Sequence, residues 1–337
     1  MTAEHEGWLQ RVWYDRAPGG FLLWPLEWLF RGLAALRRAA FRAGLADTRW
    51  VSAPVIIVGN ISVGGSGKTP LVGWLGRAAR EAGWRPAIVS RGYGGTEPRE
   101  PLVVGEGTSA AVSGDEPLML ARDTGLPVFV SRDRYAAAAQ AVAGGADLVI
   151  ADDGLQHYGL GRDAEVIVVD ATRGHGNGHC LPAGPLREPV SRLARADIVV
   201  HSNGTQGTSY RLEITEAVNL ETGERRSLES FSGAAAHVVA GIGHPARFHA
   251  ALEAFGIDVQ PIAVPDHGRL EASALSPGDA LPVLMTAKDA VKYATTSARH
   301  WMVPARVVMN DDTATALKGV LELARTRCNQ RQGGSHD

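Results

Sequence analysis

One segment constrains the fold of this chain more than any other. Val55–Gly59 is β-branched and apolar, which is typical of a buried strand. A glycine-rich loop follows and ends in Gly67-Lys68-Thr69, after which apolar residues recur at helical spacing. A strand, a glycine-rich loop, Gly-Lys-Thr and a helix in direct succession predict a phosphate-binding P-loop.

The chemistry of such a loop explains its residue types. Glycines let backbone N–H groups surround a phosphate, and the helix N-terminus adds a partial positive charge. Lys68 would bridge the β- and γ-phosphates of a nucleotide, and the Thr69 hydroxyl would hold Mg²⁺. Ser62 stands where the motif usually begins with glycine. The residues expected to bind the nucleotide are Ser62, Val63, Gly64, Gly65, Ser66, Gly67, Lys68 and Thr69.

Two carboxylates end a second apolar run. Asp152 and Asp153 come directly after the predicted strand 147–151. In P-loop enzymes an acid at the end of a neighbouring strand holds Mg²⁺ directly or through water. We therefore expect Asp152 and Asp153 at a metal site, with an acidic turn after a strand as the simpler alternative.

Further segments carry weaker signals. Asp115 precedes a helical stretch, where an acid could be a catalytic base or only complement the helix dipole. Arg187 and Glu188 could serve a phosphate and a metal, or form a surface ion pair. Tyr93 lies in a loop after a predicted strand, a position that faces the ligand edge of an α/β sheet. His267 lies in a polar loop, and its spacing alone gives little reason to expect a catalytic role.

The first fifty residues differ from the rest of the chain, because they hold five of its eight tryptophans. Pro25 could open a helix whose arginines lie mainly opposite its apolar face. That face would carry Leu26, Leu29, Phe30, Leu33, Leu36 and Ala40. Such a helix is typical of a segment lying in a membrane interface, and a helix packed on the core is the alternative. No apolar run reaches the roughly 18–20 residues that span a bilayer, and we expect no secretory signal.

Composition limits the class of protein. A net charge of −2 argues against a general nucleic-acid binder. The two cysteines, Cys180 and Cys328, exclude a disulfide scaffold and indicate a reducing compartment.

The alternation of strands and helices predicts an α/β fold of two lobes. We expect a P-loop NTPase domain with a mostly parallel sheet over 51–207, preceded by an amphipathic segment over 1–50 that packs on it. A β-hairpin linker over 208–230 would join it to a smaller α/β domain over 231–328, before a disordered tail over 329–337.

Seven short motifs occur in order along the chain. They are GNISVGGSGKTP (59–70), SRGYG (90–94), SGDEP (113–117), DDGLQH (152–157), LPAGPLREP (181–189), AGIG (240–243) and PDH (265–267). With these motifs the chain closely resembles the tetraacyldisaccharide 4′-kinase family, the lipid A 4′-kinases of Gram-negative bacteria. The resemblance extends over most of the chain.

The resemblance implies phosphorylation of the 4′-hydroxyl of tetraacyldisaccharide 1-phosphate, with ATP and Mg²⁺ as cofactors. It implies a lipid substrate and peripheral attachment to the cytoplasmic face of the bacterial inner membrane through the N-terminal helix. It gives no reason to expect a nucleic-acid or protein partner.

The resemblance also assigns roles to matching residues. It implies a catalytic group of Asp115, His267, Lys68 and Arg187, with Asp115 as base and His267 assisting it. It implies a metal site of Thr69, Asp152, Asp153 and Glu188, and it places Tyr93 at the nucleotide.

Two other functions remain open from the residues alone. A P-loop kinase of a soluble metabolite would not need the tryptophan- and arginine-rich N-terminus. A regulatory P-loop NTPase would hydrolyse nucleotide without a small acceptor and change shape with it.

Overall fold

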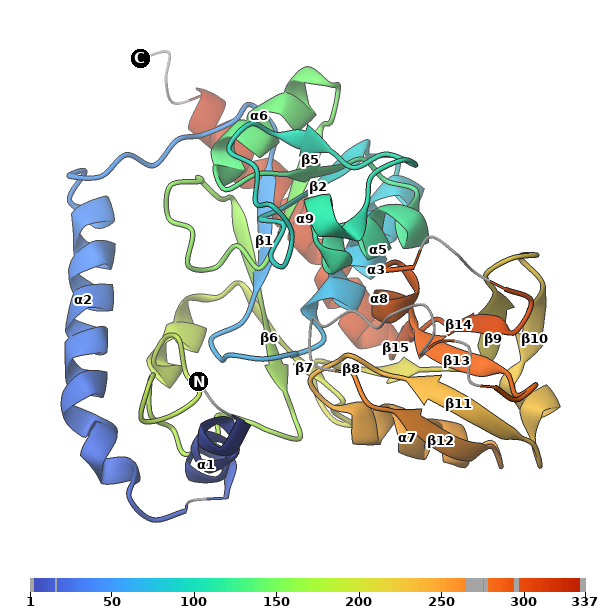
Figure 1. Ribbon diagram of the computed structural model, residues 1–337. Helices are drawn as coiled ribbons and strands as arrows, with labels where there is room; N and C mark the ends of the chain where they lie inside the picture. The colour runs from blue at the N-terminus through green and yellow to red at the C-terminus, as the bar shows by residue number, and fades with distance from the viewer. Residues whose placement is uncertain (1–2, 16, 265–274, 276–277, 294–296, 334–337) are drawn as a thin grey trace.

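The computed structural model describes residues 3–15, 17–264, 275, 278–293 and 297–333. These residues form two sheets, each covered by helices (Figure 1). Most neighbouring strands in the two sheets are parallel. The predicted α/β class with a large and a smaller sheet is therefore confirmed.

The larger sheet has the strand order β15-β8-β7-β6-β1-β5-β2-β4-β3. Its strands are β1 (Val55–Gly59), β2 (Pro86–Ser90), β3 (Leu102–Val103), β4 (Val128–Val130), β5 (Leu148–Asp152), β6 (Ala164–Asp170), β7 (Ile198–Ser202), β8 (Ser209–Glu213) and β15 (Arg306–Met309). The central strands β1, β2 and β5 are buried along their whole length. Their continuous apolar runs fit a parallel sheet covered on both faces.

Two apolar clusters fill the space on either side of this sheet. One joins the sheet to α3 (Lys68–Glu81), α5 (Asp115–Thr124), which follows the short α4 (Ala110–Ser113), and α9 (Asp311–Gly333). The other joins it to α6 (Arg134–Ala143) and the 3₁₀ turn η2 (Val190–Arg195). The P-loop between β1 and α3 is thus anchored by packing at both ends.

The smaller sheet has the order β10-β9-β14-β13-β11-β12. Its strands are β9 (Glu216–Asn219), β10 (Arg225–Ser227), β11 (Ala235–Val239), β12 (Asp258–Ile262), β13 (Val283–Thr286) and β14 (His300–Val303). The helical elements of this lobe are η3 (Leu228–Phe231), α7 (Pro245–Glu253) and α8 (Ala287–Ala290).

The lobe boundaries differ from those predicted. The segment expected as a separate hairpin linker is divided, because β8 pairs with β7 and β15 in the larger sheet while β9 pairs with β10 and β14 in the smaller one. The chain then returns to the first lobe, so residues 306–333 do not belong to the predicted C-terminal domain. Leu317 and Leu321 of α9 are buried in the first lobe's core. The helix α9 also continues to Gly333, past Asn329, where a disordered tail was expected.

The N-terminal segment packs on the first lobe through α1 (Ala3–Tyr14), the turn η1 (Gly20–Leu23) and α2 (Trp24–Arg42). Trp13 Nε1 donates to the carbonyl oxygen of Pro182 at 3.0 Å. The long helix α2 runs along one side of the molecule (Figure 1, left). No helix among the described residues is both long and apolar enough to cross a bilayer.

The face that α2 turns to the body is held mainly by polar contacts. Glu27 is buried and accepts a hydrogen bond from the backbone N–H of Cys180 at 2.9 Å, with His179 Nδ1 2.7 Å from its other oxygen. The side chains of the opposite face are exposed, among them Leu26, Leu29, Leu33 and Leu36. Phe30 of the predicted apolar face packs against the core, whereas the leucines of that face are exposed, so the helix is attached to the body by only part of that face.

Candidate active site

The P-loop has the backbone that its glycines allow. Gly64 and Gly67 have φ angles of 93° and 81°, in a region that side chains rarely permit. The hydroxyl of Tyr210, on β8, donates to the carbonyl oxygen of Gly67 at 2.7 Å. Lys68 and Thr69 follow at once as the first residues of α3. The loop thus ends at a helix N-terminus, which favours a bound phosphate.

The segment before η2 runs beside this loop, a contact that the sequence did not reveal. The backbone N–H of Val63 donates to the carbonyl oxygen of Pro185 at 2.8 Å, and that of Arg187 donates to Ile61 at 2.6 Å. These bonds bring Arg187 and Glu188 to the P-loop from more than a hundred residues away in the sequence.

The predicted acids lie at the same sheet edge, because β5 is the parallel neighbour of β1 and Asp152 pairs with Val58. The Thr69 hydroxyl lies 3.5 Å from Asp152 Oδ2. Asp153 Oδ1 lies 3.5 Å from Lys68 Nζ, and Asp153 Oδ2 lies 3.0 Å from Arg187 Nη1. The structure therefore brings five of the predicted residues into one cluster.

The two neighbouring carboxylates have opposite pKa shifts. Burial raises the pKa of Asp152 to about 7, and the charges of Glu116 and Asp153 add to the rise. Burial also opposes ionisation of Asp153, but Lys68 and Arg187 outweigh it and hold the pKa of that carboxyl below its usual range. The lysine and arginine thus have an anionic partner where the transferred phosphate of a nucleotide would carry its charge.

The donor set at Asp152 fits Mg²⁺. Within the described part of the chain, the buried atoms Asp152 Oδ1 and Ser66 Oγ have no hydrogen-bond partner. A hard divalent cation takes such oxygen ligands, and Mg²⁺ commonly uses one or two carboxylates together with substrate phosphates and water. No group of three or more histidine, cysteine or acidic residues suited to a metal occurs among the described residues. A site of one hydroxyl and one carboxylate does not need such a group.

Glu188 was predicted as a metal ligand, but in the structure its carboxylate bonds to other side chains. Both of its oxygens already have partners: Gln156 Nε2 at 3.0 Å, the Tyr158 hydroxyl at 3.0 Å and Arg38 of α2 at 3.1 Å. This buried carboxylate links the active-site loops to α2, so we do not include it among the proposed metal ligands.

Arg134, the first residue of α6, is a further site residue. It is buried, and its Nη2 donates to the backbone carbonyl oxygens of Asp152 and Asp153 at 3.3 and 2.9 Å. Asp133 before it caps α6 by accepting from Tyr135 and Ala136. Arg134 therefore fixes the backbone that carries both acids.

Asp115 begins α5, and its position depends on a close backbone contact. Gly114 has a φ angle of 85°, and a Cβ there would lie 2.6 Å from the carbonyl oxygen of Tyr93. The ring of Tyr93 is exposed. The 91–95 loop thus packs against the turn that presents Asp115. The charge of Glu116 contributes to the raised pKa of Asp152, so this turn lies near that carboxylate.

Lys292, just after α8 of the smaller lobe, reaches this acid and was not predicted. Its Nζ lies 3.6 Å from Asp115 Oδ2 and 2.9 Å from Asp289 Oδ1, and its side chain is buried. Asp289 Oδ2 also accepts from the backbone N–H of Gly241, in the AGIG motif, at 2.8 Å. The smaller lobe therefore contributes to the site at Asp115.

The same motif approaches the P-loop. A Cβ on Gly243 would lie 3.7 Å from the backbone nitrogen of Gly65. The predicted partner of Asp115, His267, lies outside the described residues. No local spacing in the sequence indicates that Lys292 pairs with Asp115 or that Arg134 bonds to the backbone of Asp152 and Asp153, because tertiary packing brings these residues together.

Comparisons with known proteins find similar chains over most of the length of this one. The model of the family described as tetraacyldisaccharide-1-P 4′-kinase matches residues 20–322. A tetraacyldisaccharide 4′-kinase of Ectopseudomonas mendocina is 47% identical over 300 residues, covering 87% of this chain and 90% of its own. One from Nitrosococcus oceani is 40% identical over 326 residues, covering 96% of each chain. The structure of LpxK from Aquifex aeolicus in complex with ATP has a TM-score of 0.76 at 27% identity, covering 90% of this chain and 99% of that one.

Proposed function

Since this chain belongs to the tetraacyldisaccharide-1-P 4′-kinase family, we propose that it transfers the γ-phosphoryl group of ATP to the 4′-hydroxyl of a tetraacyldisaccharide 1-phosphate. The product is the 1,4′-bisphosphorylated lipid A precursor. The observation that carries the proposal is the cluster of Lys68, Thr69, Asp152 and Asp153 at one edge of the larger sheet, in a chain of this family. Asp115 begins α5, which packs on the P-loop helix α3.

The residues divide the work of phosphoryl transfer. The backbone N–H groups from Gly64 to Thr69 surround the phosphates, and Lys68 contacts the transferred group. Arg187, now paired with Asp153, adds a second cation that neutralises charge on the equatorial oxygens. Because the transition state is loose, this positioning and neutralisation supplies most of the catalysis.

Thr69 and Asp152 are the residues we propose to hold Mg²⁺, with Asp153 near them. When bound, the ion would screen the phosphate oxygens and help to orient them. The unpartnered Asp152 Oδ1 supports this assignment.

Asp115 is the proposed base. It would accept the proton of the 4′-hydroxyl as the oxygen attacks phosphorus and ADP leaves. Lys292 holds this carboxylate by an ion pair, and His267 is the further partner implied by the family's motif. A base of this kind contributes about 10²–10⁴-fold to rate.

The lipid substrate needs access from a membrane, and α2 offers the surface for it. We propose that its exposed leucines lie in the interface of the cytoplasmic face of the bacterial inner membrane. The buried contacts of Glu27 and Arg38 would then hold the active site close to that surface. Tyr93 stays a proposed nucleotide contact.

A comparison of acceptors tests the proposal. The purified chain is incubated with Mg-ATP and one of three additions: tetraacyldisaccharide 1-phosphate in detergent micelles, the deacylated disaccharide phosphate, or no acceptor. We expect a bisphosphorylated product only with the acylated acceptor. Equal use of the deacylated sugar would indicate a kinase of soluble metabolites, and ATP hydrolysis unaffected by acceptor would indicate a regulatory NTPase.

A further inference from the structure

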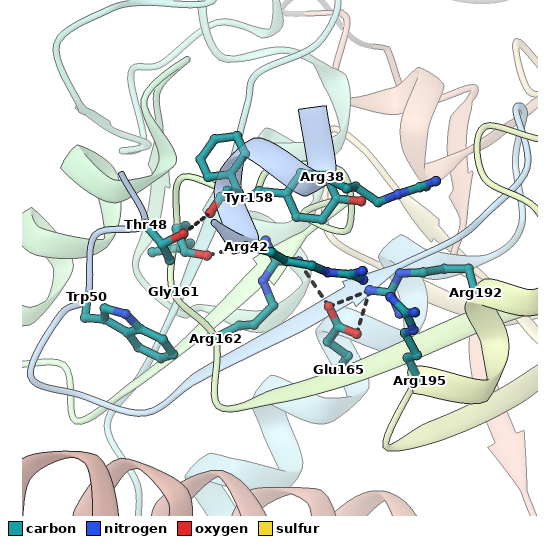
Figure 2. A pocket seen from close by; sticks show the side chains of 12 residues that line it. Arg38, Arg42, Thr48, Trp50, Tyr158, Gly161, Arg162, Glu165, Arg192 and Arg195 are labelled. Carbon is teal, nitrogen blue, oxygen red and sulfur yellow. Dashed lines mark hydrogen bonds and ion pairs between the residues drawn. The ribbon is translucent and has the colours of Figure 1, made fainter. Parts of the chain in front are cut away.

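A cavity of about 350 Å³ lies between the C-terminal half of α2 and the body of the larger lobe. This volume is within the range of roughly 300–1,000 Å³ typical of small-molecule sites. Figure 2 shows the residues that line it: Arg38, Phe41, Arg42, Thr48, Trp50, Tyr158, Leu160, Gly161, Arg162, Glu165, Arg192 and Arg195.

The cavity is distinct from the P-loop site. Glu165 lies near the start of β6, whereas the P-loop follows the end of β1. These strands are parallel neighbours, so the two sites face opposite edges of the sheet. None of the lining residues is assigned to the nucleotide, the metal or the acceptor hydroxyl, although Arg38 and Tyr158 both contact Glu188.

The cavity carries an excess of positive charge. Five arginines line it with one acid, Glu165, which pairs with Arg162 at 3.1 Å and with Arg192 at 2.7 Å. Arg38 pairs with Glu188 at 3.1 Å, and Arg192 Nε lies 3.5 Å from the same acid. Arg42 and Arg195 are exposed, and neither forms an ion pair with any residue that the structure describes. Figure 2 shows the guanidinium groups of Arg42, Arg192 and Arg195 pointing toward one another.

Arg192 gives a second and independent indication of a ligand. Its side chain is 9% exposed, yet its buried Nη1 has no hydrogen-bond partner among the described residues. An unsatisfied buried donor of this kind is costly, and a rotation of the guanidinium toward the cavity would let an anionic oxygen satisfy it. The planar donor set of arginine suits a phosphate oxygen in particular.

The orientation of α2 indicates where such a phosphate comes from. Arg38 and Arg42 lie on the inner, polar face of α2, opposite its exposed leucines. An amphipathic helix sinks its apolar face about 5–10 Å into the boundary of a bilayer, which leaves its polar face at the level of the headgroups. Basic pockets at that level bind anionic lipid headgroups.

We propose that this cavity binds the phosphate headgroup of an anionic membrane phospholipid, separately from the acceptor at the P-loop. Arg42, Arg192 and Arg195 contact the phosphate, and the aromatic residues Phe41 and Trp50 border it. The inference rests on the proposed membrane contact of α2.

Flotation of the full chain with vesicles tests it. One vesicle is phosphatidylcholine alone, and the other is an equimolar mixture with phosphatidylglycerol. Arg42→Gln is compared with Arg37→Gln, an exposed arginine of the same helix that does not line the cavity. A charge that senses only the surface potential changes binding by roughly fivefold. We expect Arg37→Gln to lower the affinity for the anionic vesicles by no more than that factor. Arg42→Gln should lower the affinity at least about tenfold further, because it also loses a charge-assisted hydrogen bond.

Two results would contradict the assignment of the cavity as a headgroup site. Equal losses in both variants would assign the effect to diffuse charge. Unchanged vesicle binding by Arg42→Gln together with a raised KM for the acceptor in neutral detergent would assign the cavity to the acceptor's own 1-phosphate. Leu29→Gln/Leu33→Gln on neutral vesicles reports separately on α2: if it binds as well as the wild type, the α2 contact fails while the comparison of arginines still applies.

Discussion

Lys292 Nζ lies 3.6 Å from Asp115 Oδ2, so a lysine of the smaller lobe is paired with the acid that begins α5 in the larger one. The same ammonium group lies 2.9 Å from Asp289, whose carboxylate is fully buried. The lobes are therefore joined at the residue that we propose as the base.

Replacing Lys292 by methionine tests this connection. The change leaves Asp289 buried without its cation, so we expect the free energy of unfolding to fall by about 3–5 kcal/mol. We also expect kcat to fall more than the affinity for ATP, because Asp115 loses its partner while the P-loop is untouched. Denaturant unfolding and steady-state kinetics measure the two effects.

Two controls separate the effect of the ion pair on Asp115 from a general loss of stability. Lys318→Met, on the exposed surface of α9, should change neither quantity. Lys292→Arg should recover part of kcat. Full turnover by folded Lys292→Met would show that the ion pair does not serve the reaction.

Magnesium dependence tests the assignment of Asp152. Chelation with EDTA should stop turnover, and added Mg²⁺ should restore it. In Asp152→Asn we expect the Mg²⁺ concentration for half-maximal rate to rise by at least about tenfold, since a carboxylate ligand is lost. Asp147→Asn, a half-exposed acid just before the same strand and away from the P-loop, is the matched control. An unchanged Mg²⁺ requirement in Asp152→Asn would exclude it as a ligand.

A substitution at Gly114 tests whether the position of Asp115 matters, because it moves the backbone without changing any charge. Alanine there would strain the backbone and meet the carbonyl oxygen of Tyr93, at a cost of about 1–3 kcal/mol. Because the strain falls on the turn before Asp115, kcat should fall together with stability. Gly105→Ala, where nothing lies within 4 Å of the added carbon, should stay within about 0.5 kcal/mol of the wild type. A tolerant Gly114→Ala would contradict the tight packing of this turn.

The attachment of α2 is tested through Glu27. Its alanine variant loses hydrogen bonds to a charged group, each worth about 1.5–3 kcal/mol. We expect α2 to detach more often and trypsin to cleave faster at Arg42 and Arg49, as followed by mass spectrometry. Glu81→Ala, an exposed acid at the end of α3, should leave the cleavage rate unchanged. Equal cleavage of all three proteins would mean that Glu27 does not hold the helix.

The parts of the site predicted from the sequence are those determined by local order. A strand followed by Gly-Lys-Thr specifies its own P-loop, and the parallel pairing of β5 with β1 then brings Asp152 to Thr69. The amphipathic pattern of α2 also predicted a helix with one apolar face, and the structure shows the leucines of that face exposed and its Phe30 packed on the core.

The parts that were missed depend on contacts between distant segments. The antiparallel pairing of β15 with β8 returns the C-terminus to the first lobe, and no local pattern specifies that partner. Lys292 reaches Asp115 only because α8 packs on α5. The sequence predicts Glu188 as an acid near the phosphates. Its burial among Arg38, Gln156 and Tyr158 depends instead on how α2 packs on the body.

The central claim is that Asp115 accepts the proton of a lipid-linked sugar hydroxyl in phosphoryl transfer from ATP. The most direct measurement is a single-turnover assay with Mg-ATP and tetraacyldisaccharide 1-phosphate in micelles, comparing the wild type with Asp115→Asn. We predict that the variant binds ATP as the wild type does and forms the bisphosphorylated product about 10²–10⁴-fold more slowly. Product formation at the wild-type rate by the variant would contradict the account.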